Sequence, residues 1–308
     1  MFKLIYSFHM PFFMLISGYL FFFSEQKRKM VELIEYKGKS LLYPILMCSL
    51  LNLLLTNGIS SIMGGYSSLK SCAIGTIPIS SLWFLWSVLA CSIAIAFAMK
   101  ISNRPIIQGV LMIVGIPLVA LFPNWSLNLY MYPYFVIGYL YARNGKHFSK
   151  AKPVIGISST VIFAVMMCFY EKKHYIYTSG LFGGDTIMES LYIDFFRWAI
   201  GLFGSITVIW LCEIVFTRIK HGRLTAGIEN LGKDSLAVYA LSVSLLSYWL
   251  PRVSNKMLSV LTWIDWNKYI WLYNLIITPI VAIAYSCVLL LIIRGLKKVG
   301  AYRLIFGR

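Results

Sequence analysis

The chain has 308 residues, of which 59% are hydrophobic and only 13% carry a formal charge, and its mean hydropathy is +0.76. An average soluble domain is roughly 45–50% apolar and about 25% charged, so this composition excludes a soluble globular enzyme, a disordered tail and a disulfide-stapled secreted domain. The net charge of +17 would suit a nucleic-acid binder, so the distribution of the basic residues has to decide.

Nine apolar segments follow one another along the chain, and a bilayer-spanning helix needs roughly 20 apolar residues. Backbone groups in lipid must bond within the protein, and the sequence lacks the alternating pattern of an outer-membrane barrel. We therefore predict an all-α fold, a polytopic integral membrane helical bundle with about nine transmembrane helices in one membrane-embedded domain over residues 1–308. The segments are Tyr6–Phe23, Ser40–Thr56, Leu82–Met99, Ile106–Phe122, Leu127–Tyr141, Val154–Tyr170, Leu191–Phe216, Ser235–Leu250 and Tyr269–Ile293.

The basic residues lie mainly in alternate connections between these segments. Twenty of the 28 fall on one side of the predicted membrane and six on the other, as the positive-inside rule describes. We expect the richer side and the C-terminus in the cytoplasm, and we expect no nucleic-acid partner. The twenty are Lys27, Arg28, Lys29, Lys37, Lys39, Lys100, Arg104, Arg143, Lys146, Lys150, Lys152, Arg218, Lys220, Arg223, Lys233, Arg294, Lys297, Lys298, Arg303 and Arg308, and the six are Lys70, Lys172, Lys173, Arg252, Lys256 and Lys268.

The cysteines and the common enzyme motifs argue against metal or soluble-enzyme chemistry. No two cysteines form a C-x-x-C pair, and nearly all lie within apolar runs, so we expect small buried hydrophobic residues with no metal site and no disulfide framework. Nucleophile-elbow, zinc-protease, Walker and dinucleotide-binding patterns are absent from the sequence. The cysteines are Cys48, Cys72, Cys91, Cys168, Cys212 and Cys287.

Polar side chains inside apolar helices are the next candidates, because such residues in membranes usually serve a function. His9 stands early in the first segment and can hold or release a proton near neutral pH. Ser17 is about two helical turns deeper, so that both side chains could face one cavity. Pro11 suits the first turn of a helix. The structural alternative for His9 is an interfacial histidine that bonds to backbone or water.

Two further groups of side chains have both a structural and a functional interpretation. Asp194 and Arg197 stand three residues apart on the seventh segment and can pair along one helix face, either to lock helices together or to contact substrate. Aromatic residues crowd the third and fifth segments, where they form an interfacial belt or a stacking surface for a sugar. These aromatic residues are Trp83, Trp86, Tyr130, Tyr132 and Tyr134.

The basic cluster Lys27-Arg28-Lys29 can hold the phosphates of a nucleotide-like cofactor by charge, although the positive-inside bias alone also explains it. Pro117 and Pro279 interrupt apolar segments, as in the broken helices of transporters, but no internal repeat pairs them. A glycan or lipid-intermediate transporter or flippase therefore stays open as an alternative function, as does a non-catalytic subunit of polysaccharide assembly.

Four motifs in order resemble the acyltransferase family 3 membrane proteins, and in particular the fucose 4-O-acetylase-like and polysaccharide O-acetylase group. The first is Tyr6-Ser7-Phe8-His9-Met10-Pro11-Phe12-Phe13, which continues to Ile16-Ser17-Gly18-Tyr19-Leu20-Phe21. The others are Lys39-Ser40-Leu41-Leu42-Tyr43-Pro44, Leu82-Trp83-Phe84-Leu85, and Asn230-Leu231-Gly232-Lys233-Asp234-Ser235-Leu236 leading to Tyr239. The resemblance spans nearly the whole chain.

The resemblance implies a bacterial inner-membrane enzyme that takes an acyl group, usually acetyl, from acetyl-CoA and transfers it to a hydroxyl of a glycan or lipid-linked glycan precursor. Family members have ten helices, and the helix before the His-Met-Pro segment carries the basic residue and the histidine that serves as base. We expect this chain to lack that helix, which also explains why we predict nine helices here, one fewer than in family members. Where many relatives have a histidine, this chain has Ser242.

The resemblance also assigns candidate roles to residues of this chain. His9 is expected to support the reacting group, and Ser17 to line the same cavity. Trp83 and Tyr134 are expected against the glycan, with Asp194 and Arg197 nearby. Arg28, Lys39 and Arg143 are the candidates for the phosphates of acyl-CoA, and membrane lipid is the remaining partner.

Overall fold

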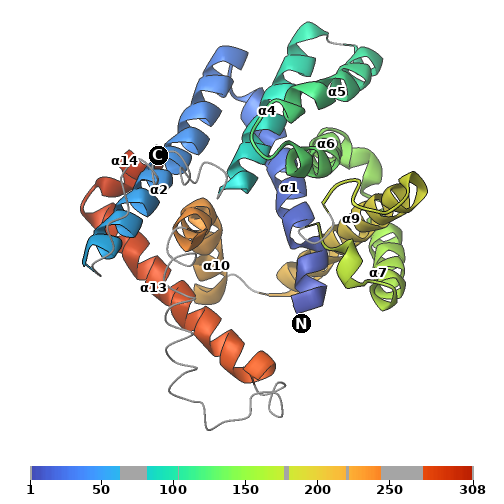
Figure 1. The fold of residues 1–308 in the computed structure, drawn as a ribbon. Coiled ribbons are helices and arrows are strands. Elements are labelled where there is room, and N and C mark those ends of the chain that lie inside the picture. Colours follow the sequence, from blue (N-terminus) through green and yellow to red (C-terminus); the bar gives the residue numbers. More distant parts are fainter. Residues whose placement is uncertain are drawn as a thin grey trace. The chain divides into compact units, whose positions relative to one another are not determined.

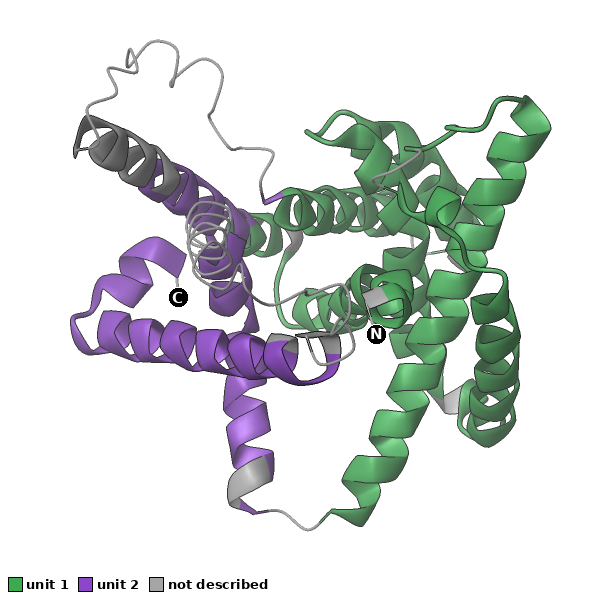
Figure 2. Ribbon diagram, turned by 60° about the horizontal axis from the view of Figure 1, so that its bottom comes forward, with its two compact units in different colours: residues 1–37, 83–221 green, residues 38–82, 222–308 purple. Residues whose placement is uncertain are grey.

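The computed structural model describes residues 2–62, 82–102, 104–176, 180–219, 222–243 and 273–306. The regular elements in these ranges are helices, which confirms the all-α prediction (Figure 1). The chain divides into two compact units, which have different colours in Figure 2. Unit 1 contains Met1–Lys37 and Trp83–His221, and unit 2 contains Gly38–Leu82 and Gly222–Arg308.

In unit 1, helix α1 (Phe2–Gln26) is the central element. It packs against α6 (Trp125–Phe148), α9 (Ile187–Arg218) and α4 (Trp83–Ile101). Helix α5 (Pro105–Ala120) packs on α4 and α6, and α7 (Lys152–Cys168) packs on α9, as Figure 1 shows. A short 3-10 turn, η2 (Lys172–His174), lies between α7 and α9 and contacts α9.

Two glycines allow α1 and α6 to cross at backbone contact. A Cβ atom on Gly18 would lie 2.0 Å from the carbonyl oxygen of Phe135, and one on Gly138 would lie 2.0 Å from that of Leu15. Small residues at membrane helix crossings permit this close approach, and here the relation is reciprocal. The crossing therefore fixes α1, with its polar N-terminal half, against α6.

A buried amide ties the end of α5 to α4 and α6. Asn128, which is fully buried on α6, donates from Nδ2 to the carbonyl of Pro123 at 2.9 Å. Its Oδ1 accepts a hydrogen bond from Ser87 of α4 at 2.6 Å. The amide thus supplies a donor near the end of α5, where backbone carbonyls lack partners within the helix.

Unit 2 begins within α2 (Met30–Ile62), whose first residues belong to unit 1. It continues with α10 (Arg223–Lys233), a helical stretch over residues 235–243, a π-helical turn η3 (Tyr273–Ile277), α13 (Thr278–Lys298) and α14 (Ala301–Phe306). Asp234, after α10, pairs with Lys297 of α13 at 2.7 Å. This ion pair joins elements far apart in the sequence.

The predicted segments from Tyr6–Phe23 to Leu191–Phe216 fall, in order, on α1, α2, α4, α5, α6, α7 and α9. Ser235–Leu250 and Tyr269–Ile293 are helical over 235–243 and 273–293, and their other residues lie outside the described ranges. Within those ranges four helices are long and apolar enough to span a membrane: Lys3–Gln26, Trp83–Ile101, Ile187–Arg218 and Leu275–Lys298. The number of nine stays a prediction.

The described cysteines only partly match the expectation of burial. Cys48 and Cys91 are buried, whereas Cys168, Cys212 and Cys287 are exposed on the helix surfaces. A thiol on an apolar helix face needs no burial within the protein where lipid covers that face. Of the cysteines and basic residues named above, Lys70, Cys72, Lys220, Arg252, Lys256, Lys268 and Arg308 lie outside the described residues.

Candidate functional site

A small cavity lined by both polar and apolar residues lies in unit 1, near the N-terminal end of α1. Its volume is about 20 Å³, which is room for one water-sized group. Side chains from α1, α4, α6, α9 and the segment after α7 line it, and residues from five stretches of sequence therefore meet at one place. The lining residues are Tyr6, Ser7, His9, Met10, Pro11, Trp83, Tyr130, Met131, Tyr170, His174, Ile176 and Arg197.

His9 is half-buried in this wall, and its tautomer follows from its contact. The ring Nδ1 lies 3.1 Å from the carbonyl oxygen of Ile5. A carbonyl only accepts, so Nδ1 must carry the hydrogen, and in the neutral ring Nε2 then holds a lone pair. His9 is thus bonded to backbone, as its structural interpretation proposed, and it still offers an acceptor nitrogen. The contact fits both interpretations.

Pro11 does not begin a helix, contrary to the prediction from its position. Helix α1 starts at Phe2 and encloses Pro11, which packs toward α9 where Gly201 leaves room: a Cβ on that glycine would lie 2.8 Å from the Pro11 ring. Proline has no N–H, so the carbonyl of Ser7 receives no helical hydrogen bond from position 11. Ser7 is one of the residues that line the cavity.

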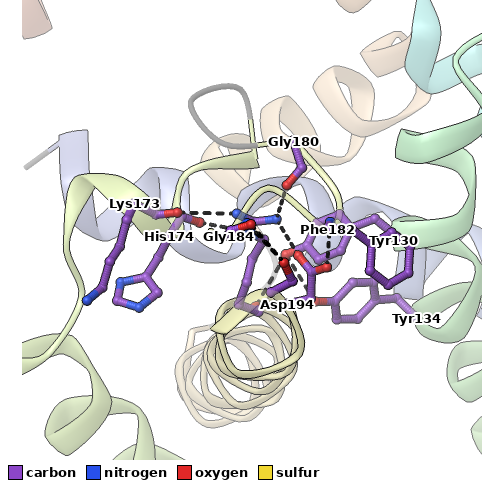
Figure 3. Close-up of polar contacts among 10 residues, drawn as sticks. Tyr130, Tyr134, Lys173, His174, Gly180, Phe182, Gly184 and Asp194 are labelled. Carbon is purple, nitrogen blue, oxygen red and sulfur yellow. Dashed lines mark hydrogen bonds and ion pairs between the residues drawn. The ribbon is translucent and has the colours of Figure 1, made fainter. Parts of the chain in front are cut away.

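The predicted pairing of Asp194 with Arg197 is confirmed, with Nη1 and Oδ1 2.8 Å apart. Arg197 also donates to three backbone carbonyls of the segment between α7 and α9: to His174 and Gly180 at 2.9 Å each, and to Lys173 at 3.3 Å. In Figure 3 these bonds converge on one guanidinium. The second carboxylate oxygen of Asp194 accepts from the N–H of Phe182, a residue with φ of +57°. The pair therefore anchors this segment on α9.

Three tyrosines of α6 pack against α9 and α5, and they do not form an interfacial belt. Tyr130, Tyr132 and Tyr134 are all buried. Tyr130 donates to the carbonyl of Arg197 at 3.3 Å, and Tyr134 donates to that of Trp198 at 3.0 Å. Tyr132 donates to the carbonyl of Met112 at 2.6 Å. Buried hydroxyls find partners inside the protein, which is why these rings pack between helices.

The structure brings some of the predicted acceptor-site residues together and leaves others apart. Trp83 and Arg197 line the cavity with His9. Tyr134 contacts a lining residue instead: its hydroxyl lies 3.3 Å from that of Tyr130. Ser17 is not among the described residues that line the cavity. Its hydroxyl donates to the carbonyl of Phe13 at 2.8 Å, within α1.

Of the cations predicted for a phosphate-bearing donor, Arg28 and Arg143 have different partners within unit 1. Arg28 stacks over the ring of Tyr36 at 3.9 Å, and Arg143 donates to the side chain of Gln108. Lys39 lies in the part of α2 that belongs to unit 2. The three positions therefore stay candidates on charge alone.

Two adjoining grooves of about 610 and 430 Å³ lie along α1, α6, α7 and α9, toward the other end of α1. Leu15, Tyr141 and Ile209 line both of them, and so do Lys152 and Glu213, which pair at 2.8 Å. The lining is otherwise mostly apolar. These grooves offer space for a hydrocarbon-like group with a charged pair beside it.

Comparison with known proteins identifies the family. Residues 1–293 match the acyltransferase family 3 domain, which is described as an acyltransferase domain. The chain belongs to this acyltransferase family. It is also similar to the nodulation protein NolL of Sinorhizobium fredii, with 31% identity over 251 residues that make up 77% of this chain and 66% of NolL. The chain thus spans about two thirds of that relative's length, and no solved structure matches it.

One histidine of this acyltransferase domain escaped the sequence analysis. His174 is 2% exposed, lines the His9 cavity and lies in the turn that Arg197 holds. In the sequence it follows two lysines in a connection between apolar segments, where a solvated position is the ordinary expectation. Only the folding of that connection back onto α9 reveals its burial.

Proposed function

We propose that this protein is an integral-membrane O-acyltransferase that moves an acyl group, acetyl in the first instance, from acyl-CoA to a hydroxyl of a cell-surface glycan or its precursor. Membership of the acyltransferase family over residues 1–293 supports the reaction class. The observation that carries the site is the His9 cavity, where His9 lines one small space together with the buried residues Ser7, Tyr130, His174 and Arg197.

The chemistry requires a polar group at that place. The acceptor hydroxyl attacks the thioester carbonyl, a C–O bond forms and the C–S bond breaks. The hydroxyl proton ends on the departing sulfur, so that CoA leaves as its free thiol. Such a step needs a group that receives the hydroxyl proton and donors that stabilise the developing oxyanion. We assign His9 a supporting role, in which Nε2 accepts a hydrogen bond from the acceptor hydroxyl. Trp83 would lie against the sugar ring.

The other acceptor-site candidates have less direct roles in this proposal. Tyr134 would support the cavity from behind through Tyr130, and Ser17 would act only on a group that reaches deeper along α1. Because Arg197 already holds three carbonyls and Asp194, its contacts favour shaping the acceptor side over direct substrate binding.

We place the acyl-CoA donor on the basic side of the protein, with Arg28, Lys39 and Arg143 as its phosphate partners. A guanidinium has five N–H donors, so the bond from Arg143 to Gln108 is compatible with phosphate binding. The apolar grooves beside Lys152 and Glu213 suit the acyl and pantetheine part. In this arrangement about nine helices of a single domain cross a bacterial inner membrane, with a cytoplasmic C-terminus and lipid around them.

The test is acyl transfer in membrane vesicles of a strain that expresses the full chain, with radiolabelled acetyl-CoA as donor and label in extracted glycan as the readout. His9→Ala should reduce transfer by roughly tenfold, which corresponds to the loss of one hydrogen bond worth about 1.4 kcal/mol. His147→Ala, a histidine at the far end of α6, serves as the matched control and should retain transfer.

Two results would overturn different parts of the proposal. Full transfer by His9→Ala would remove His9 from the site. No labelling by the unaltered protein, together with movement of unmodified glycan across the vesicle membrane, would replace the acyltransferase with the transporter alternative.

A further inference from the structure

The segment between α7 and α9 forms one wall of the His9 cavity, through Tyr170, His174 and Ile176. Arg197 of α9 holds this segment in place by donating hydrogen bonds to the backbone carbonyls of Lys173, His174 and Gly180. The position of the wall therefore depends on the shape of the short turn that presents the first two of those carbonyls.

The imidazole of His174 closes that turn from inside. Its Nδ1 accepts the backbone N–H of Glu171 at 2.9 Å, and the N–H of His174 donates back to the Glu171 carbonyl at 3.0 Å. In Figure 3 the His174 carbonyl points toward the ion pair while its ring turns away from Asp194. The ring thus acts on the cavity through the backbone of its own turn.

This arrangement requires a neutral imidazole. Only an unprotonated Nδ1 can accept a hydrogen bond, and the ring is packed against Tyr170 and Phe196, with centroids 5.8 and 4.4 Å away. Its Nε2 is buried and has no hydrogen-bond partner in the described structure. Protonation would therefore break one bond and place an additional charge in an aromatic enclosure.

The charged and titratable groups around His174 add to this cost. Burial, and then the nearby charge of Lys173, lower the pKa of His174, and Glu171 only partly offsets them. On α9, the carboxylate of Asp194 is already bonded to Arg197 and to the Phe182 N–H. The other titratable residues around the cavity and the ring are Tyr6 and His9 of α1, Tyr130 of α6, Tyr170 and Tyr175 beside the turn, and Tyr192 of α9.

We propose that His174 is a positioning residue for the His9 cavity and that it holds the cavity wall only while its imidazole is neutral. Protonation would release the Glu171 N–H and place a second cation beside Arg197, so the turn would loosen from α9 and the wall would lose its fixed geometry. The proposal rests on the proposed acyl transfer for its catalytic consequence, but the loosening itself is independent of any activity.

The sign of the pH effect follows from the lowered pKa. A histidine whose pKa is depressed by folding contributes stability that is fully present above its unfolded value, near 6.5, and is lost as the pH falls through the lower folded value. We therefore expect a well-ordered turn at pH 7 to 8 and progressive loosening below pH 6.5.

The first experiment is hydrogen–deuterium exchange of the full chain in lipid nanodiscs between pH 5 and 8, corrected for intrinsic exchange rates. Amides of Glu171, His174 and Tyr175 should progressively lose protection toward the acid end of this range, because protonation of His174 removes the bond that closes the turn. His174→Asn keeps an acceptor near the Nδ1 position and cannot be protonated, so its protection should not change with pH. His174→Gln is the second variant if the first does not fold, and His147→Asn is the control.

An unaltered protein whose turn keeps its protection at pH 5 would overturn the proposal, and so would His174→Asn with the same acid-induced loss as the unaltered protein. The second readout is the pH profile of acyl transfer, whose acid limb should move to lower pH in His174→Asn. His9 is present in both proteins, so the difference between the profiles belongs to His174. If the unaltered protein shows no transfer at any pH, the proposed function fails while the exchange data still decide the role of His174.

Discussion

Two ion pairs stand near opposite ends of α9, and both have nitrogen and oxygen 2.8 Å apart. The side chains of Arg197 and Asp194 are 3% and 15% exposed, whereas those of Lys152 and Glu213 are 38% and 46% exposed. Along the helix, Asp194 and Glu213 are separated by about 28 Å, close to the thickness of a bilayer core. Equal distances at the two ends therefore occur in very different surroundings.

The separation of nitrogen and oxygen alone therefore does not determine how much an ion pair contributes to stability. The buried guanidinium also bonds three carbonyls of another segment, so its removal would take a donor from each of these carbonyls and the counter-charge from the Asp194 carboxylate. The exposed pair lies beside two grooves and can exchange its partner for water, which makes such pairs worth little. The fold depends on the first pair and tolerates changes in the second.

The largest effect is expected at Arg197. Arg197→Ala should lower the free energy of unfolding by about 3–5 kcal/mol, the usual cost of removing one partner from a buried pair. Unfolding in detergent micelles, followed by tryptophan fluorescence, measures this change. The free energy of unfolding of Arg197→Lys should lie between those of the unaltered protein and Arg197→Ala, because an ammonium keeps the charge but cannot reproduce the planar set of bonds. A loss below about 1 kcal/mol for Arg197→Ala would show that the buried pair is no more important than a surface pair.

A smaller effect is expected where α1 and α6 cross at Gly18 and Gly138. Gly138→Ala places a methyl group against the Leu15 carbonyl and should cost about 1–3 kcal/mol, as overpacking does. Gly145→Ala on the same helix meets nothing within 4 Å and should be neutral or stabilise by up to about 1 kcal/mol. The same unfolding assay compares them. Equal effects of the two substitutions would mean that α1 and α6 do not need this close crossing.

The sequence predicted the order of the helices of unit 1 because most of the apolar runs are long; the short run Leu127–Tyr141 falls within the longer helix α6. It also predicted the Asp194–Arg197 pair, since residues three apart on a helix must be neighbours. It placed Pro11 wrongly, because the apolar pattern before it is short and the helix extends back to Phe2. Local pattern thus succeeded where the cause of the structure is local.

Features that depend on distant segments were not predictable in this way. The tyrosines of α6 were equally consistent with a membrane belt until the carbonyls of α9 and α5 were seen to accept their hydroxyls. Likewise, nothing in the sequence indicates that the connection after α7 returns to Arg197 and buries His174. The shared cause is tertiary packing, which decides whether a polar residue meets water, lipid or another helix.

The smallest effect is expected at the exposed pair, and it completes the comparison with Arg197. Glu213→Gln removes the charge at nearly constant shape and should change the free energy of unfolding by no more than about 1 kcal/mol. Salt distinguishes the two pairs further, because about 1 M salt screens exposed charges over roughly 3 Å and affects buried charges much less. Unfolding of both variants at low and high salt should therefore show that added salt removes the Glu213→Gln difference and leaves the Arg197→Ala difference. A salt-independent loss above about 2 kcal/mol for Glu213→Gln would mean that lipid or the grooves shield this pair from water, so that both ends of α9 act alike.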